Sequence, residues 1–415
     1  ITYDSINNIS ITPEYLSSLV LKKLKQDYIS VRSKDITSAV ITYPANFTNE
    51  KREATILAGK LSDLPLGPAI NEPTAAALYF ATQENLPPGK YAIYDFGGGT
   101  WDISVAEVHG KEINVITTNG LVECGGKDFD KQLEILINEK FKSQAGMDID
   151  LSIQSQSIFE STKKSLTIRE NTNVAIRQNN APPVTLNISR DEFEKSISTI
   201  LAQTEIICKS LFNKHDDISD VLLVGGSTRV PAVVNSITKT FGKPPLIVGN
   251  PDEVVALGAA LYSAIRSDSS KLNPAQSNHL SKVSFQEISN HYLGVAALQI
   301  NESSGSLENK PSYIIEKGTK IPCSITEQYF TMSENQDSVT LEVIQSQIPE
   351  TDMRFVNVQW EGKLNLPPNL PAGEQINVNF EITEDGILHC SFSHSDSGNE
   401  EKITLAIDYE INDAK

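Results

Sequence analysis

Three consecutive glycines between two acidic residues carry the clearest chemical information in this sequence. They are Gly97 to Gly99, within the segment Tyr94 to Val105, where apolar and polar residues alternate on both sides. Such alternation predicts two strands joined by a tight turn. Glycine lets the backbone approach an anion closely and turn its amide groups toward it. Asp95 and Asp102 bracket the turn, where a carboxylate can orient a metal-bound water. The segment therefore indicates a phosphate site rather than a purely structural turn.

A second glycine turn follows another apolar run. The residues from Val221 to Val224 are typical of a buried strand, and Gly225-Gly226 follows them directly. Pro231 is placed to open a helix shortly afterwards. A strand, paired glycines and a helix start form a recurrent anion cradle, to which Arg229 adds a cation. Two such turns predict a duplicated fold that holds phosphates from two sides.

Six segments of the chain, in order, resemble the seventy-kilodalton heat-shock chaperones of the bacterial DnaK type. They occur at family-like spacing over most of residues 1 to 266. Residues 291 to 409 resemble the peptide-binding β-domain of the same family. The resemblance implies an α/β fold, an actin-like or hexokinase-like ATPase domain, followed by an all-β sandwich. The six segments are Ala39 to Phe47, Ile70 to Ala77, Asp95 to Val105, Gly125 to Asp130, Val221 to Arg229, and Asn250 to Ala260.

Composition limits the classes of partner. The 415 residues carry a net charge of −18, with 39% hydrophobic residues, as in a soluble multidomain protein. A strongly acidic surface disfavours nucleic acid and anionic membranes, because both are polyanions. The four cysteines form no C-x-x-C pair, which favours reduced thiols over a disulfide or metal site. We therefore expect a cytoplasmic protein without nucleic-acid or membrane partners. The cysteines are Cys124, Cys208, Cys323 and Cys390.

The domain boundaries follow from shifts in pattern. Residues 1–266 alternate strands and helices, as expected of a nucleotide-binding domain lacking its first part, with residues 125–196 as an inserted helical and β subdomain. Residues 267–290 lose periodicity and predict an interdomain linker. Residues 291–409 contain short alternating strands, which predict a β-sandwich that binds peptide.

Local signals predict the elements of the first domain. Thr12-Pro13 starts a helix that runs to about Tyr28, with one apolar face. Ile36 to Tyr43 is rich in β-forming residues and predicts a strand. Thr48 caps the next helix, and Glu72-Pro73 begins another that continues through Ala81.

Hydrolysis of a phosphoanhydride needs donors on the phosphates, Mg²⁺ to spread charge, and a carboxylate that orients the attacking water. By resemblance, Asp95 belongs to the Mg²⁺–water network, Glu72 orients the lytic water and Thr100 contacts the terminal phosphate. The alternative interpretation of Glu72 is that its carboxylate only stabilises the first turn of a helix through a favourable interaction with the helix dipole. The residues expected to donate to the phosphates are Gly97, Gly98, Gly99, Thr100, Gly225, Gly226 and Ser227.

A further set matches the family's nucleotide-binding residues: four of them match its adenosine-contacting helix, and Arg229 and Asp252 complete the set. Four of its members are spaced three or four apart on one helix face, where the alternative is a solvated charged surface. Lys164 stands where the family usually has Arg, which stacks on a base better than Lys does. Lys127 replaces an acidic residue that is usual after the two glycines. The set comprises Glu160, Lys163, Lys164, Thr167, Arg229 and Asp252.

Pro44 and Arg52 match a pair of residues that is proposed to transmit the nucleotide state in the family. The alternative interpretation is that Pro44 is an ordinary proline at a strand end and Arg52 an ordinary arginine on a helix surface. The family's linker is a nearly continuous apolar stretch that ends in Asp. Here apolar and polar residues alternate in the corresponding stretch, and Glu287 stands at the acidic position. Because this stretch would bury less apolar area, we expect weak interdomain coupling.

Four residues of the second domain align with the family's apolar peptide pocket, which holds an extended peptide by backbone pairing and aliphatic contacts. The alternative is ordinary sandwich core. They are Val295, Leu298, Phe330 and Val339.

The resemblance thus implies an ATP-dependent molecular chaperone of the heat-shock class, an ATPase that binds extended hydrophobic segments of unfolded proteins. ATP binding and hydrolysis would regulate peptide exchange, with ATP or ADP and Mg²⁺ as cofactors. The expected partners are client peptides, a J-domain co-chaperone and a nucleotide exchange factor. Two alternatives stay open: a pseudo-ATPase co-chaperone or exchange partner of the same family, and a sugar kinase or actin-like filament protein. The β-rich tail argues against the second.

The family's opening phosphate turn, with its lysine, has no counterpart before Ile1, and the helical lid is absent after Lys415. Charge-assisted hydrogen bonds contribute about 1.5–3 kcal/mol each, so lacking two or three weakens nucleotide binding by roughly 10³–10⁴. We therefore expect the chain as given to bind ATP poorly and to hydrolyse it hardly at all.

Overall fold

The structure of the protein is a computed structural model that describes residues 3–6, 9–83, 86–155, 157–179, 181–266, 280, 283–300, 305–384 and 386–405. The chain divides into two compact units. The first unit comprises residues 1–78, 111–117 and 259–415, and the second comprises residues 79–110 and 118–258. Within the described residues, no helix is long and apolar enough to cross a membrane.

Two packed helices dominate the start of the first unit. The side chain of Thr12 accepts a hydrogen bond from the backbone N–H of Tyr15 at 3.2 Å and so caps α1. This confirms the predicted start, although the helix continues four residues past Tyr28. Thr48 caps α2 in the same way. The elements of this region are β1 (Tyr3–Ile6), β2 (Ile9–Ile11), α1 (Pro13–Arg32), β3 (Thr42–Tyr43), α2 (Asn49–Leu61), β4 (Ile70–Asn71) and α3 (Glu72–Ala81).

The strand predicted over Ile36 to Tyr43 is wrong in length. Only Thr42–Tyr43 forms a strand, paired in parallel with β4, and Ala39 makes a single bridge to Leu66. A run of β-forming residues becomes a strand only where a partner offers backbone groups. Among the described residues the partner β4 is itself two residues long.

The second unit is built on a sheet that contains both glycine turns. Strand β5 (Gly89–Phe96) pairs antiparallel with β6 (Thr100–His109), which confirms the predicted hairpin. Strand β10 (Ile218–Val224) pairs in parallel with β5. Strand β7 (Glu112–Val122) follows β6, and the hydroxyls of Ser104 and Thr118 meet at 2.8 Å. Most residues of β5, β6 and β10 are buried.

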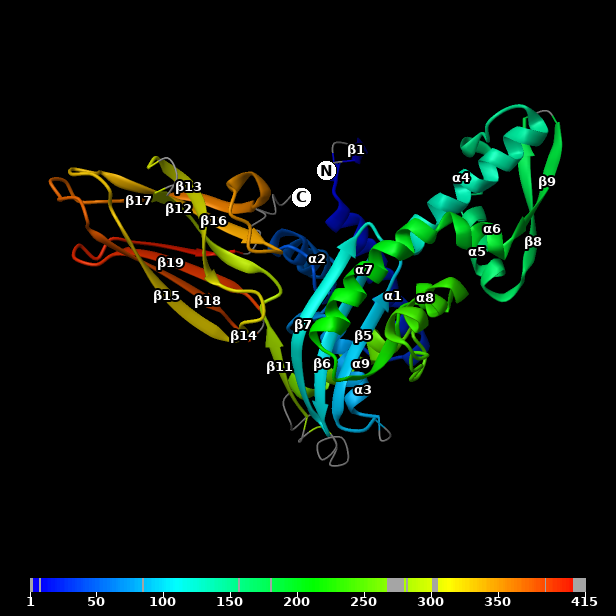
Figure 1. Cartoon of the computed structure of the whole chain (residues 1–415), viewed down its shortest axis with the longest axis horizontal. Coiled ribbons are helices and arrows are strands. Elements are labelled where there is room, and N and C mark those ends of the chain that lie inside the picture. Colours follow the sequence, from blue (N-terminus) through cyan, green and yellow to red (C-terminus); the bar gives the residue numbers. More distant parts are fainter. Residues whose placement is uncertain are drawn as a thin grey trace. The chain divides into compact units, whose positions relative to one another are not determined.

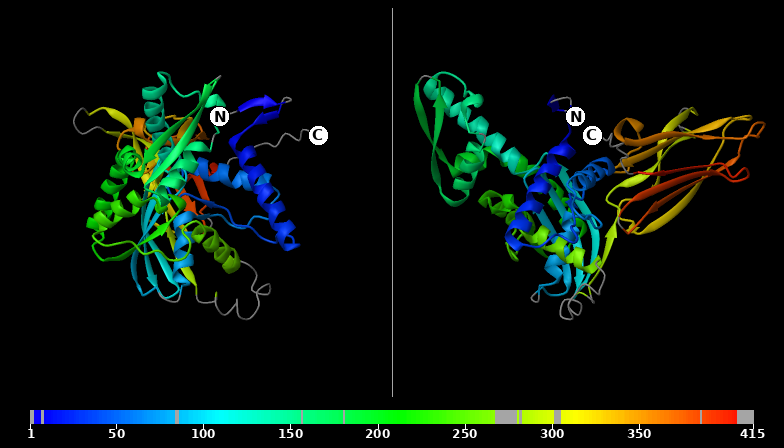
Figure 2. Two further views of the ribbon diagram at one scale, coloured as in Figure 1. Left: turned by 90° about the vertical axis from the view of Figure 1, so that its right-hand side faces the viewer. Right: turned by 180° about the vertical axis from the view of Figure 1, so that it is seen from behind.

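Helices complete the second unit. The hairpin β8–β9 packs on α4 and α5, and Figure 2 shows these elements together at one end of the unit. The elements are α4 (Gly126–Ala145), η1 (Leu151–Ile153), α5 (Ile158–Ile168), β8 (Asn171–Gln178), β9 (Ala181–Ser189), α6 (Arg190–Ser196), α7 (Ser198–Lys214), η2 (Gly226–Arg229) and α8 (Pro231–Phe241). Helix α9 (Val254–Arg266) begins in the second unit and ends in the first.

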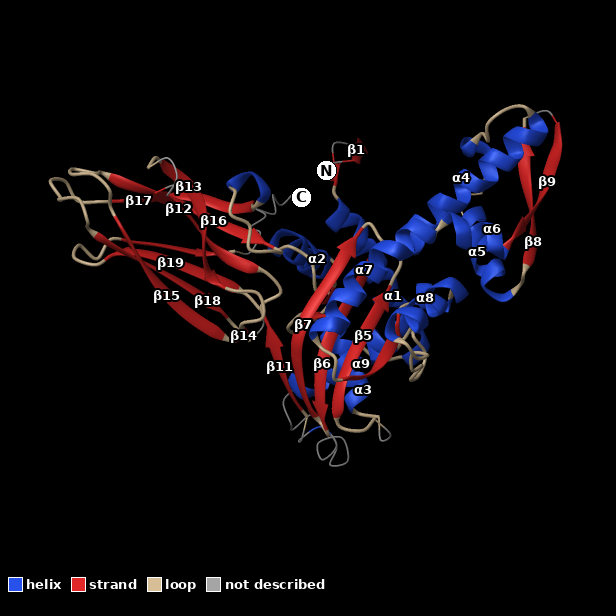
Figure 3. Cartoon of the chain, in the orientation of Figure 1, coloured by secondary structure: helices blue, strands red, loops and turns tan. Residues whose placement is uncertain are grey.

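The end of the chain forms a β-sandwich within the first unit, as Figures 1 and 3 show. One sheet has the strand order β13-β12-β16-β17 and the other has the order β15-β18-β19-β20. The strands are β11 (Ser284–Ile288), β12 (Tyr292–Ile300), β13 (Leu307–Ile315), β14 (Lys320–Ile321), β15 (Cys323–Phe330), β16 (Ser338–Ser346), β17 (Asn357–Asn365), β18 (Gln375–Ile382), β19 (Leu388–His394) and β20 (Glu400–Thr404), with η4 at Met353–Phe355.

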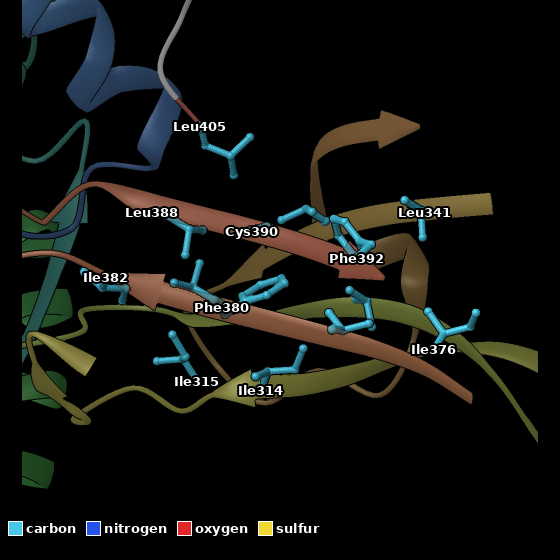
Figure 4. Close-up of a cluster of buried hydrophobic side chains, with 14 of the residues drawn as sticks. Ile314, Ile315, Leu341, Ile376, Phe380, Ile382, Leu388, Cys390, Phe392 and Leu405 are labelled. Atoms are coloured by element: carbon cyan, nitrogen blue, oxygen red, sulfur yellow. The ribbon is translucent and has the colours of Figure 1, made fainter. Parts of the chain in front are cut away.

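The sandwich has a continuous apolar core. Figure 4 shows side chains from several strands, among them Ile315, Phe380 and Phe392, gathered between the ribbons. These three residues are fully buried. Alternate residues of β18 and β19 are buried in this core, as the two-residue period of a strand requires.

Part of the predicted linker is a strand. Residues 267–279, 281 and 282 lie outside the described residues, but Ser284–Ile288 forms β11. Residues Ser284 to Gln286 pair in parallel with Glu112 to Asn114, and the next two residues pair with β14. The ring of Phe285 also packs edge-on against Tyr262, with 5.4 Å between centroids. Backbone hydrogen bonds to β7 and β14 therefore hold β11 in place. The weak coupling expected earlier considered only the apolar area that this segment buries.

Candidate functional site

The two predicted glycine turns lie against each other in the second unit. The hydroxyl of Ser227 donates a hydrogen bond to the carbonyl oxygen of Gly97 at 2.8 Å. Gly225 adopts φ +85°, and a Cβ there would collide with the carbonyl group of Phe96 and lie 2.8 Å from Asp95 Oδ1. Only glycine allows this approach, so Gly225 serves the contact between the turns, whereas a Cβ at Gly226 would meet the Asp252 carboxylate.

A third turn joins the same cluster. The N–H of Gly126 donates to the Gly97 carbonyl at 3.0 Å, and the N–H of Lys127 donates to Gly98 O at 2.8 Å. A Cβ at Gly125 would lie 2.5 Å from backbone atoms of the opposite turn. Sequence reasoning did not assign the Gly125-Gly126 pair a role at the phosphate site. Its position immediately before a helix was the available signal.

The cluster leaves part of the first turn open. Nothing lies within 4 Å of the position that a Cβ would occupy at Gly98 or Gly99. The turn is also closed tightly at its base, where Gly97 N–H donates to Thr100 O at 3.1 Å. The exposed backbone at its tip fits the expected role of a phosphate-binding turn.

Asp95 and Asp102 face each other across the hairpin and are both buried. Burial raises the pKa of Asp95 to about 7. No hydrogen bond or ion pair to the Asp95 carboxylate is formed by the described residues. A buried carboxylate with free oxygens fits a magnesium ion or its water shell, because Mg²⁺ is bound by oxygen ligands and usually retains water.

The predicted adenosine residues come together only in part. Glu160 and Lys164 form an ion pair of 2.7 Å on the exposed face of α5, and the hydrogen bond from Lys164 lowers the pKa of Glu160. Arg229 holds Asp252 through two nitrogens at 3.0 and 2.7 Å. Thr167 donates its hydroxyl to the backbone of its own helix.

Lys163 has a different environment from Lys164. Its ammonium donates to Gly126 O at 2.7 Å and pairs with Asp130 at 2.9 Å, and its side chain is largely buried. It therefore ties α5 to the first residue of α4, next to the glycine turns.

The predicted catalytic residues fall in different units. Glu72 is the first residue of α3 and belongs to the first unit, whereas Asp95 and Thr100 belong to the second. Its neighbour Asn71 accepts the Thr74 N–H at 2.9 Å, which satisfies one donor of the first helical turn.

The four residues predicted to bind peptide line one cavity in the sandwich. The cavity has a volume of about 730 Å³ and opens between the β12–β16 surface and the end of β15. Val295 is buried at its base, whereas Leu298 and Phe330 are 55% and 57% exposed. The volume is in the range of ligand-binding pockets, and large exposed apolar side chains at a cavity are typical of binding surfaces. Val339 completes the set.

Two of the three residues predicted to couple the domains, Arg52 and Glu287, line a second, smaller cavity of about 80 Å³ in the first unit. Arg52 is buried, lies over the ring of Tyr43 and bonds to Glu53 at 3.0 Å. Glu287 accepts a hydrogen bond from Asn71 at 3.0 Å, and burial raises its pKa to about 7. Pro44 follows Tyr43 directly and is partly buried.

Sequence reasoning missed two residues at this cavity. Asn49, the first residue of α2, donates its side-chain amide to Leu405 O at 2.8 Å and its backbone N–H to Gln345 at 3.1 Å. His291 is buried, which lowers its pKa to about 4. Neither belongs to a sequence pattern that signals a site.

A protein-family model described as "Hsp70 protein" matches residues 2–415. The chain belongs to the Hsp70 family. The match covers both the α/β part and the sandwich, so the predicted family and fold class are confirmed. Hsp70 membership supports a chaperone role and ATP binding with Mg²⁺ in general.

Proposed function

We propose that this member of the Hsp70 family is an ATP-dependent molecular chaperone that binds extended hydrophobic segments of unfolded proteins. ATP binding and hydrolysis regulate peptide exchange in this proposal. The observation that carries it is the cavity of about 730 Å³, which Val295, Leu298, Phe330 and Val339 line together. An extended peptide would pair with backbone groups and place apolar side chains among these residues.

The glycine turns support the nucleotide part of the proposal. Backbone N–H groups of Gly98, Gly99 and Gly226 would hold the phosphates, and the hydroxyl of Thr100 would contact the terminal one. The other predicted donors, the N–H groups of Gly97 and Gly225 and the hydroxyl of Ser227, donate instead to Thr100 O, Pro251 O and Gly97 O. When bound, Mg²⁺ would neutralise phosphate charge, with Asp95 fixing its water shell. Glu72 would orient the attacking water. The adenosine would lie against the set on α5 and the Arg229–Asp252 pair.

Pro44, Arg52 and Glu287 would couple the nucleotide state to the sandwich. The direct bonds of Asn49 to Gln345 and Leu405 support this route, because they join a helix of the ATPase part to two segments of the β-domain. By family resemblance, the partners would be client peptides, a J-domain co-chaperone and a nucleotide exchange factor, in the cytoplasm. Domain boundaries at 266 and 291 belong to the same proposal.

Peptide binding is tested with a fluorescent extended peptide rich in Leu and the variant Phe330→Ala. Burying a Phe side chain contributes about 1.5–3 kcal/mol, so the variant should bind about tenfold or more weakly. Phe355→Ala is the matched control, because Phe355 is 66% exposed in the same domain and lies outside the cavity. Equal affinity of the two variants would contradict the proposed peptide site.

ATP regulation is tested by the rate of peptide release with and without ATP. Acceleration by ATP supports the proposal. Tight ATP binding without turnover in a single-turnover assay would favour the alternative of a pseudo-ATPase co-chaperone. Sugar-dependent phosphotransfer or ATP-dependent sedimentation would favour the kinase or filament alternative.

A further inference from the structure

Lys127 has its backbone fixed directly against the first glycine turn. It is the second residue of α4, and its N–H donates to Gly98 O at 2.8 Å. The preceding residue, Gly126, donates to Gly97 O at 3.0 Å. These two consecutive hydrogen bonds fix the position of the Lys127 backbone. The Lys127 side chain therefore starts beside the first glycine turn, whose tip at Gly98 and Gly99 is open.

Among the described residues, the Lys127 ammonium has no ion-pair partner, and its side chain is exposed. The nearest acidic residue in sequence, Asp128, instead accepts the Gly125 N–H at 2.8 Å and caps the helix. Lys163, the other lysine at the turns, is paired with Asp130.

The position is also electrostatically unfavourable for a cation. The first turn of a helix carries partial positive charge, so acidic residues stabilise it and lysine opposes it. An uncompensated cation at the start of a 20-residue helix, beside a glycine turn, becomes favourable when an anion binds there.

We propose that Lys127 is a specificity-determining residue of the nucleotide site, whose ammonium binds the di- or triphosphate tail held at the Gly97–Gly99 turn. The inference rests on the proposed ATP site and extends it. Lys127 selects nucleotides by their phosphates and contributes nothing to recognition of the adenosine moiety.

The test compares Lys127→Gln with Lys131→Gln in the full chain. Lys131 lies one turn further along α4, is equally exposed, and controls for the loss of one positive charge. Affinities for ATP, ADP and adenosine are measured by titration calorimetry, with ligand up to the millimolar range. Removing one charge-assisted contact should weaken ATP and ADP binding by about tenfold or more in Lys127→Gln. Adenosine binding should be unchanged, and Lys131→Gln should match the wild type for all three ligands.

A second readout separates a binding role from a structural one. Without nucleotide, Lys127→Gln should melt at the same or a higher temperature than the wild type, because the substitution removes an unfavourable charge from the helix start. Unchanged ATP affinity in Lys127→Gln overturns the inference about Lys127 but leaves the proposed nucleotide site standing. An equal loss in Lys131→Gln, or for adenosine, overturns it too. Failure of the wild type to bind ATP overturns the proposed nucleotide site and this inference together.

Discussion

The contact between the two glycine turns predicts a large stability loss on substituting Gly225 by Ala. The residue adopts φ +85° and ψ 147°, a region that is essentially restricted to glycine, and a side chain there costs about 1–3 kcal/mol. In addition, a Cβ would lie 2.6 Å from the carbonyl carbon of Phe96, so one backbone segment must move. Overpacking of this kind costs about 1–3 kcal/mol. The expected loss is therefore about 2–6 kcal/mol.

Gly242→Ala is the matched control. Gly242 also has positive φ, +89°, at the end of α8, but nothing lies within 4 Å of its Cβ position. Gly242→Ala should lower the free energy of unfolding only by the cost of placing alanine at positive φ, about 1–2 kcal/mol. The difference between the two variants measures the close approach of the turns.

Urea unfolding followed by tryptophan fluorescence is the assay. Trp101 is fully buried in β6, next to the first turn, and is the local reporter. The second tryptophan, Trp360, is replaced by Phe in every variant, so that fluorescence reports the second unit alone. If Gly225→Ala is no less stable than Gly242→Ala, the turns do not touch in solution and the argument for a shared phosphate cradle is refuted.

Two further predictions use other parts of the structure. Lys163→Met should destabilise the second unit by about 1–3 kcal/mol, since it leaves the half-buried carboxylate of Asp130 without its partner, whereas Lys164→Met should cost clearly less because its ion pair is exposed; equal losses by urea unfolding would refute this. Burial raises the pKa of Glu287 to about 7 and lowers that of His291 to about 4. The Glu287 contribution to stability is thus present below about pH 4.5 and lost as pH rises through 7, while that of His291 is present above about 6.5 and lost as pH falls through 4. Glu287→Gln should flatten the pH dependence of the melting temperature above pH 4.5, and His291→Gln should flatten it below pH 6.5; unchanged slopes would contradict the burial of both groups.

Sequence reasoning succeeded where a local signal determines the structure. The caps Thr12 and Thr48, the hairpin around Gly97–Gly99 and the strand before Gly225 all depend on a few adjacent residues. The alternation in Ile376 to Ile382 likewise predicted a strand of the sandwich, and β18 covers this segment.

It failed where the structure depends on distant partners. The length of the strand ending at Tyr43 is limited by β4, and the docking of β11 depends on hydrogen bonds to Glu112–Asn114. No pattern near Asn49 signals its bonds to residues about 300 and 360 positions away. Resemblance to a family identified the residues of the large cavity, but the partnership of Lys163 with Gly126 and Asp130 needed coordinates.

The pairing of β11 with β7 has a consequence for biosynthesis. Strand β7 pairs with β6 on one side, but Glu112 to Asn114 acquire their partners on the other side only when Ser284 to Gln286 have been translated, roughly 170 residues later. At about 5–20 residues per second, the nascent chain presents an unpaired edge for about 10–35 s. During this interval the edge can recruit strands from other molecules. At this edge the ribosome-bound intermediate is therefore open to aggregation in a way that the finished chain, with β11 in place, is not.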